Sequence, residues 1–273
     1  MATQQKEMSF LGHLEELRWH LVRSAAAIFI LAITFFIFAE EVYTHFLLAH
    51  TSPDFITYQL FCDFFNLFGM ESDFCSINIG EKKLQSIKVT SQLMNSIWSS
   101  LILGLIVAFP YLLWEIWRFV SPGLTEKEIK KSRGFIFIAS LLFFIGVLFS
   151  FYVIAPVSIN FLYNYQITET IENSFTLESH IGLVTNMLLG VSILFELPVL
   201  IYFLAKIGLI TPEFLQRYRK HALVVVLVLA AIITPPDVAS QVIVAIPILI
   251  LYEIGIIVAR RVIKKQEKNA YKS

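Results

Sequence analysis

Long apolar runs are the feature that most constrains this chain of 273 residues. A helix needs about 20 mostly apolar residues to cross the ~30 Å hydrocarbon layer of a bilayer. Four runs reach or approach that length and two shorter ones follow, so the sequence predicts six transmembrane helices. The predicted spans are 22–39, 93–117, 135–155, 181–205, 222–233 and 242–259.

The composition also indicates a bilayer rather than water as the solvent. Hydrophobic residues make up 57% of the chain and charged residues 15%, with a mean hydropathy of +0.72. Soluble domains average about 45–50% hydrophobic residues and about 25% charged residues. One soluble core of this size cannot bury so much apolar surface, and a disordered or basic nucleic-acid-binding chain is excluded. We therefore predict an all-α, multi-pass membrane protein forming a single membrane domain over residues 1–273.

The placement of basic residues predicts the orientation of these spans. Only three of the 21 Lys and Arg residues, Lys82, Lys83 and Lys88, fall on one side. The other eighteen lie before the first span or at its start, after the second and fourth spans, and in the tail 260–273. Because Lys and Arg are enriched in cytoplasmic loops, both termini are predicted to be cytoplasmic and the long loop 40–90 to be external.

The external loop 40–90 contains an aromatic-rich segment at 55–65 and the two cysteines, Cys62 and Cys75. Two cysteines are too few for a disulfide scaffold or a zinc site. An oxidising compartment permits a bridge between them, and two buried free thiols fit equally well. The aromatic segment is too short to span, which favours a helix or loop on the outer leaflet or against the bundle. A protein-binding patch is the alternative.

Glu196 is an ionisable residue inside the fourth predicted span. It lies nine residues before Ala205, about 13 Å inside the cytoplasmic edge. Ionisable groups at such depth are candidates for functional sites. A structural role fits the sequence equally well: a protonated Glu196 bonded to a neighbouring helix, with Pro198 opening the backbone locally.

The fifth run is too short to cross a bilayer of ordinary thickness. Its helix is expected to begin earlier, with Thr211 as N-cap and Pro212 in the first helical position. Pro235 and Pro236 end it, and Asp237 is placed to cap the next helix. This arrangement predicts either a concave bundle in a thinned bilayer or a simple tilt of the last two spans.

Two carboxylates outside the apolar runs are candidates for binding a basic peptide. Glu16 can also form an i,i+4 pair with His20, and Glu128 can close a capping box that begins at Thr125. Together, on the cytoplasmic side, they could hold two arginines through bidentate, charge-assisted hydrogen bonds.

Catalytic signatures are absent from the sequence. It contains no His-Glu-x-x-His, no Gly-x-Ser-x-Gly and no phosphate-binding loop. We therefore expect no enzymatic activity, no cofactor and no metal site.

Several motifs match those of one known family and occur in the same order along the chain. They cover residues 13–256: HLEELR at 13–18, FVSPGL at 119–124 with Glu128, FELPV at 195–199, TPPDVASQ at 234–241, Ile246-Pro247, and LYEIG at 251–255. With these motifs and six predicted spans, the chain resembles the TatC family, the multispan receptor subunit of the twin-arginine protein translocase.

The resemblance implies a receptor for signal peptides with paired arginines that supports export of folded proteins, driven by the proton gradient. It places the arginine-binding carboxylates at Glu16 and Glu128, and Glu196 on the concave face of a glove-shaped bundle. It further implies single-span partner subunits of the TatA and TatB type, a homo-oligomer within a larger complex, and the bacterial inner membrane. Neighbours of the two carboxylates in the family's site would be Leu17, Arg18, Phe119 and Pro122.

The chain departs from the family pattern in two places. The external loop is longer and more aromatic than expected, and Glu115 stands where an amide is expected. The alternative function is a proton-coupled small-solute transporter that uses Glu196 as its proton site. Such transporters show internal repeats, and no repeat is visible among these spans.

Overall fold

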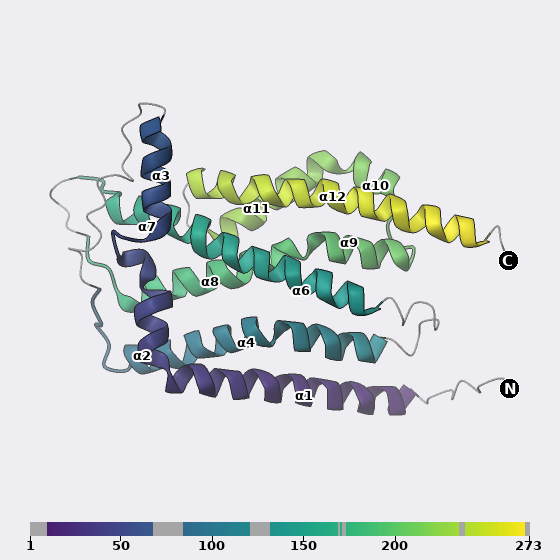
Figure 1. Cartoon of the computed structure of the whole chain (residues 1–273), viewed down its shortest axis with the longest axis horizontal. Helices are drawn as coiled ribbons and strands as arrows, with labels where there is room; N and C mark the ends of the chain where they lie inside the picture. Colours follow the sequence, from purple (N-terminus) through teal and green to yellow (C-terminus); the bar gives the residue numbers. More distant parts are fainter. Residues whose placement is uncertain are drawn as a thin grey trace. The chain divides into compact units, whose positions relative to one another are not determined.

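A computed structural model describes residues 10–67, 84–120, 132–168, 170, 173–234 and 238–270 (Figure 1). Within these ranges the regular structure is helical and no strand is formed, apart from an isolated parallel bridge between Gln85 and Thr176. The all-α prediction is therefore confirmed. The chain divides into two compact units: unit 1 is Met1–Ala39 with Ser96–Leu141, and unit 2 is Glu40–Asn95 with Leu142–Ser273.

Among the described residues, five helical stretches are long and apolar enough to cross a membrane. They correspond to the first four predicted spans and the last one. The third continues past the predicted end at residue 155, as far as Asn164. The stretches are α1 (Phe10–Ile37), α4 (Ser91–Val120), α6 (Ser132–Phe149) continued by η6 (Ser150–Ile154) and α7 (Ala155–Asn164), α8 (Leu177–Phe195) continued by α9 (Leu197–Lys206), and α12 (Val238–Ala270).

The fifth predicted span corresponds to α11 (Arg219–Ile233), a helix of 15 residues. Its length of about 22 Å is shorter than the hydrocarbon layer, so α11 is not among the five long stretches. Before it, the Thr211 hydroxyl accepts the Phe214 N–H at 3.2 Å and Pro212 opens α10 (Pro212–Arg217). This confirms the predicted cap. Pro235, Pro236 and Asp237 lie outside the described residues.

Unit 1 depends on a close approach of α1 and α4. A Cβ atom added at Gly104 would lie 2.8 Å from the backbone N of Ala32 and 2.9 Å from the backbone O of Ile28. Only glycine permits this distance, in the way that small residues commonly bring membrane helices together.

The main packing in unit 2 joins α9 and α10 to α12. The Tyr252 hydroxyl on α12 donates a hydrogen bond to the Leu215 carbonyl on α10 at 2.8 Å. This bond satisfies the polar end of a buried aromatic ring inside an apolar cluster. The cluster consists of Ile201, Ala205, Leu215, Tyr252, Ile256 and Ala259.

A π-helical turn, η6, interrupts the third stretch just before Pro156. Proline has no N–H, so no amide at this position can reach the carbonyls four and five residues earlier, those of Tyr152 and Phe151. Side chains from the loop after α1 supply the missing donors. Thr57 Oγ1 donates to the Tyr152 carbonyl at 2.6 Å, and His50 Nε2 donates to the Phe151 carbonyl at 2.8 Å.

His50 belongs to a buried group that we name the His50–His180 cluster: His50, Thr57, Tyr58, Tyr163 and His180. The Tyr58 hydroxyl donates to the His50 carbonyl at 2.9 Å, and His180 Nε2 lies 3.3 Å from the Leu47 carbonyl. Tyr163 Oη lies 3.0 Å from His180 Nδ1. Burial lowers the pKa of His50 to about 4, so this ring is neutral at pH 7. The cluster fixes the loop after α1 to the η6–α7 segment.

The aromatic-rich segment of this loop forms α3 (Ile56–Leu67), the dark blue helix in Figure 1. Shorter elements precede it: α2 (Ala39–Val42), η1 (Tyr43–Leu47) and η2 (Ala49–Thr51). Its side chains Ile56, Leu60, Phe64 and Leu67 share one face and are exposed. Cys62 is in a disulfide. Cys75, the other cysteine of the sequence, lies outside the described residues, so the pairing stays a prediction.

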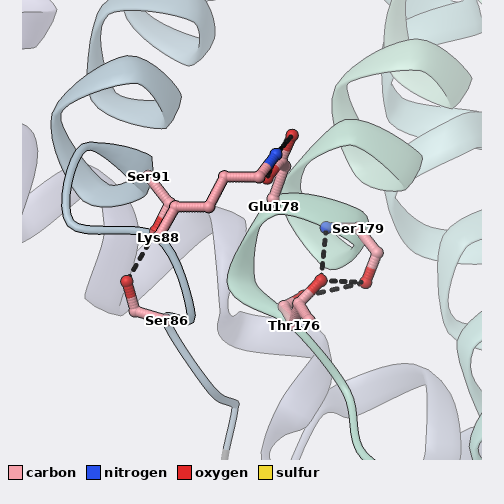
Figure 2. A network of polar contacts seen from close by, with 6 residues as sticks. All are labelled: Ser86, Lys88, Ser91, Thr176, Glu178 and Ser179. Atoms are coloured by element: carbon pink, nitrogen blue, oxygen red, sulfur yellow. Dashed lines mark hydrogen bonds and ion pairs between the residues drawn. The ribbon is translucent and has the colours of Figure 1, made fainter.

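Figure 2 shows how the segment before α4 meets the start of α8. The Gln85 N–H donates to the Phe175 carbonyl at 2.8 Å and its carbonyl accepts from the Leu177 N–H at 2.9 Å. Lys88 Nζ lies 3.1 Å from a carboxylate oxygen of Glu178. Both side chains are exposed, so this ion pair contributes little to stability. The backbone bonds join the two segments.

Candidate functional site

Glu16 and His20 lie one turn apart on the same face of α1 in unit 1. Glu16 is half-buried, and its Oε2 atom is buried without a hydrogen-bond partner among the described residues. The i,i+4 pair that the sequence allowed is therefore not formed. A buried carboxylate oxygen without a partner is costly, and an incoming donor would remove that cost.

His20 is bonded instead to Glu115 on α4. Its Nδ1 contacts Glu115 Oε2, and both side chains are buried. The second oxygen, Oε1, accepts a hydrogen bond at 2.8 Å from the hydroxyl of Tyr111, one turn earlier on α4. Only 1% of the Glu115 side chain is exposed. Both of its oxygens are thus satisfied within unit 1.

Two arginines surround this buried carboxylate. Arg23 Nη1 lies 3.9 Å and Arg118 Nη1 3.8 Å from Glu115 Oε1. Each is also held elsewhere: Arg23 Nε donates to the Trp19 carbonyl at 3.2 Å, and the Arg118 guanidinium lies 4.9 Å from the ring centroid of Trp114. Their positive charges compensate the negative charge of Glu115 in a region of reduced dielectric.

The structure places some of the predicted site residues together. The ring of Phe119 packs edge-on against His20, with centroids 6.2 Å apart and an interplanar angle of 67°. Leu17 is half-buried and Arg18 is exposed, both next to Glu16 on α1. Pro122 and Glu128 lie outside the described residues. The sequence did not single out the bond between His20 and Glu115, although the unexpected acid at position 115 was a signal for it.

Glu196 lies at the break between α8 and α9 in unit 2. It is the last residue before α9 and has helical backbone angles, with φ −75° and ψ −2°. Pro198 removes one backbone donor from the next turn, as the sequence suggested. Glu196 Oε1 is buried without a hydrogen-bond partner in the described part of the chain. The packing beside it is tight, because a Cβ atom at Gly146 would lie 2.8 Å from Ser192 Cα.

We expect Glu196→Gln to be tolerated better than Glu196→Leu. The amide keeps the size and hydrogen-bonding capacity of the acid, whereas leucine leaves any donor or water in the break unpaired. Export of a reporter should fall about tenfold further with leucine than with glutamine. The control is Ile193→Leu, which alters an exposed apolar side chain one turn earlier. Equal export by the Gln and Leu variants would show that Glu196 has no special role.

A metal site is not evident in the described ranges, where no three His, Cys, Asp or Glu side chains group to hold an ion.

Comparison with known proteins identifies the family. The model of the Sec-independent protein translocase protein (TatC) matches residues 12–247. The chain belongs to the TatC family. This confirms the resemblance carried by the sequence motifs. Together with the five apolar helical stretches among the described residues, it makes the chain a multi-pass membrane protein of a protein translocase.

Relatives of the TatC family match nearly the whole chain. The TatC protein of Blattabacterium sp. subsp. Periplaneta americana is 37% identical over 269 residues, covering 97% of this chain and 100% of that protein. The TatCy protein of Bacillus subtilis is 31% identical, with 97% and 93% covered. A crystal structure of a twin arginine translocase receptor, TatC, superposes with a TM-score of 0.69 at 31% identity, covering 92% of this chain and 99% of that one.

Proposed function

We propose that this TatC-family protein is the signal-peptide receptor of a twin-arginine translocase, with Glu16 and Glu128 each binding one guanidinium of the peptide. The observation that carries the proposal is Glu16 Oε2, buried and unpartnered among the described residues although His20 is one turn away. A guanidinium would supply the missing donors through charge-assisted bonds. Phe119, Leu17, Arg18 and Pro122 complete the proposed site. The name of the crystallised relative, a twin arginine translocase receptor, supports the same role.

The proposed topology has six spans and both termini in the cytoplasm of a bacterial inner membrane. In it α11 is the fifth span, and α10 with its cap extends this span into the cytoplasmic water. Eighteen of the 21 basic residues lie on the side of the termini, which supports the orientation. The site at Glu16 then faces newly made proteins before their export.

The proposed receptor works without an enzymatic step of its own. It assembles as several copies with small single-span subunits of the TatA and TatB type. Transport draws on the proton gradient, and Glu196 serves as the polar residue inside the membrane. Family membership supports these assignments.

Export of a folded reporter protein tests the proposal. A bacterial strain that lacks its own TatC is supplied with this chain and with a reporter that carries a twin-arginine signal peptide. We expect the reporter outside the cytoplasm, and a reporter with two lysines in place of the arginines should be retained, because lysine cannot form bidentate bonds. Retention of both reporters, despite normal insertion of the chain together with its partner subunits, would contradict the proposed function.

A further inference from the structure

One histidine and two arginines of unit 1 gather around Glu115 and not around Glu16. His20 contacts Glu115 directly, and the guanidinium nitrogens of Arg23 and Arg118 lie within 4 Å of the same carboxylate. Glu16, on the same helix as His20, has a buried oxygen with no partner in the described part of the chain. Both oxygens of Glu115 therefore have partners within unit 1, whereas Glu16 keeps one oxygen without a partner among the described residues.

Helix geometry makes Glu16 the alternative partner for His20. Side chains four residues apart on a helix are neighbours, with Cβ atoms about 5–6 Å apart. Arg23 lies seven residues after Glu16, on the same face two turns away. If Glu115 were absent, the shortest move that gives His20 a carboxylate partner is a rotation toward Glu16. The buried oxygen of Glu16 would then be occupied from within the chain.

We propose that Glu115 is an internal counter-ion that holds His20 and Arg23 away from Glu16, so that the Glu16 carboxylate stays open for a guanidinium of the signal peptide. Glu115 is a positioning residue: its 1% exposure prevents contact with a peptide, and it acts through His20. The inference rests on the proposed function. It accounts for an acid at a position where the family resemblance leads us to expect an amide, since an amide cannot neutralise the nearby arginines.

Peptide binding to the full chain tests this role. The chain is placed in vesicles of phosphatidylethanolamine and phosphatidylglycerol, and a fluorescent twin-arginine signal peptide is titrated against it. We expect Glu115→Ala to weaken binding about tenfold, because His20 then competes with the peptide for a charge-assisted bond at Glu16. Glu115→Gln keeps the side-chain volume but not the charge, and should lie between wild type and Glu115→Ala. Glu15→Ala, at the exposed neighbour of Glu16, is the control for loss of one negative charge.

The decisive variant is the double substitution of Glu115→Ala with His20→Ala. Removing the competing imidazole should restore much of the affinity lost in Glu115→Ala, to within about threefold of wild type. A purely structural role of Glu115 predicts the opposite, because deleting its partner as well enlarges the cavity. Unchanged affinity of Glu115→Ala and Glu115→Gln, or a double variant as weak as Glu115→Ala, would overturn the inference. If Glu115→Ala fails to fold, the same comparison uses Glu115→Gln. The affinity of this variant for the peptide is then measured with and without His20→Ala, and His20→Ala should again restore binding.

The outcome for Glu16 separates this inference from the proposed function. If Glu16→Ala binds the peptide as tightly as wild type, the proposed site is wrong, whatever Glu115 does. If Glu16→Ala weakens binding while both Glu115 variants leave it unchanged, the site holds and only the counter-ion role is rejected.

Discussion

Replacing both Glu16 and Glu128 by alanine is expected to weaken binding of a twin-arginine signal peptide at least about a hundredfold and to abolish export of the reporter. Hydrogen bonds to charged groups contribute about 1.5–3 kcal/mol each, and tenfold in affinity corresponds to about 1.4 kcal/mol. Losing one such interaction at each carboxylate therefore removes most of the discrimination for arginine. The measurement is crosslinking of a photoreactive signal peptide to the chain in membranes, together with export of the reporter.

The matched control for this pair is Glu15→Ala with Glu126→Ala. These substitutions remove the same charge from positions adjacent in sequence, or nearly so, to the proposed site. Membrane insertion should be unchanged in both double variants, because neither replaces a residue in the core of an apolar span. Undiminished crosslinking to the Glu16→Ala, Glu128→Ala variant would refute the assignment of the signal-peptide site.

Among glycine-to-alanine substitutions in unit 1, Gly104→Ala is expected to lower the free energy of unfolding the most. The new Cβ would lie 2.8 Å from the Ala32 backbone N and 2.9 Å from the Ile28 backbone O, which cannot yield as a flexible side chain would. Helix α1 must then shift away from α4. Overpacking of this kind costs about 1–3 kcal/mol. Thermal unfolding of the purified chain in detergent should show a lower midpoint, and peptide binding should weaken because His20 moves relative to Glu115.

Gly182→Ala provides the comparison. A Cβ atom at Gly182 would meet no heavy atom within 4 Å, so alanine adds helix propensity without a clash. Its unfolding midpoint should equal or exceed that of wild type. Equal midpoints for the Gly104 and Gly182 variants would show that the close approach of α1 and α4 does not limit stability.

Most of the helical architecture could be predicted because apolar runs of sufficient length have few alternatives in a bilayer. The cap at Thr211 and the break at Glu196 were also predictable, since proline acts on the backbone next to it. The extension of the third stretch to Asn164 was not predicted. The sequence shows Pro156 after an apolar run, but not that Thr57 and His50 from a distant loop satisfy the carbonyls that proline leaves without donors.

The candidate site was predictable only in part, for a similar reason. Local spacing identified Glu16 and offered His20 as its partner. In the structure His20 bonds not to Glu16 but to Glu115, a residue 95 positions away in sequence. Glu115 can contact His20 because α1 packs against α4, and this packing is a property of the folded helices. Pairings of this kind cannot be read from a local pattern.

The His50–His180 cluster makes the stability of the chain depend on pH. With its pKa at about 4, His50 in the folded chain keeps its proton count, and hence its bonds to the backbone, through mild acidification. The unfolded chain takes up a proton near the ordinary value of 6.5, so the free energy of unfolding falls as the pH drops from about 6.5 toward 4. Mild acid therefore lowers the free energy of unfolding of the chain, while His50 stays neutral and keeps its bond to the Phe151 carbonyl in the folded state.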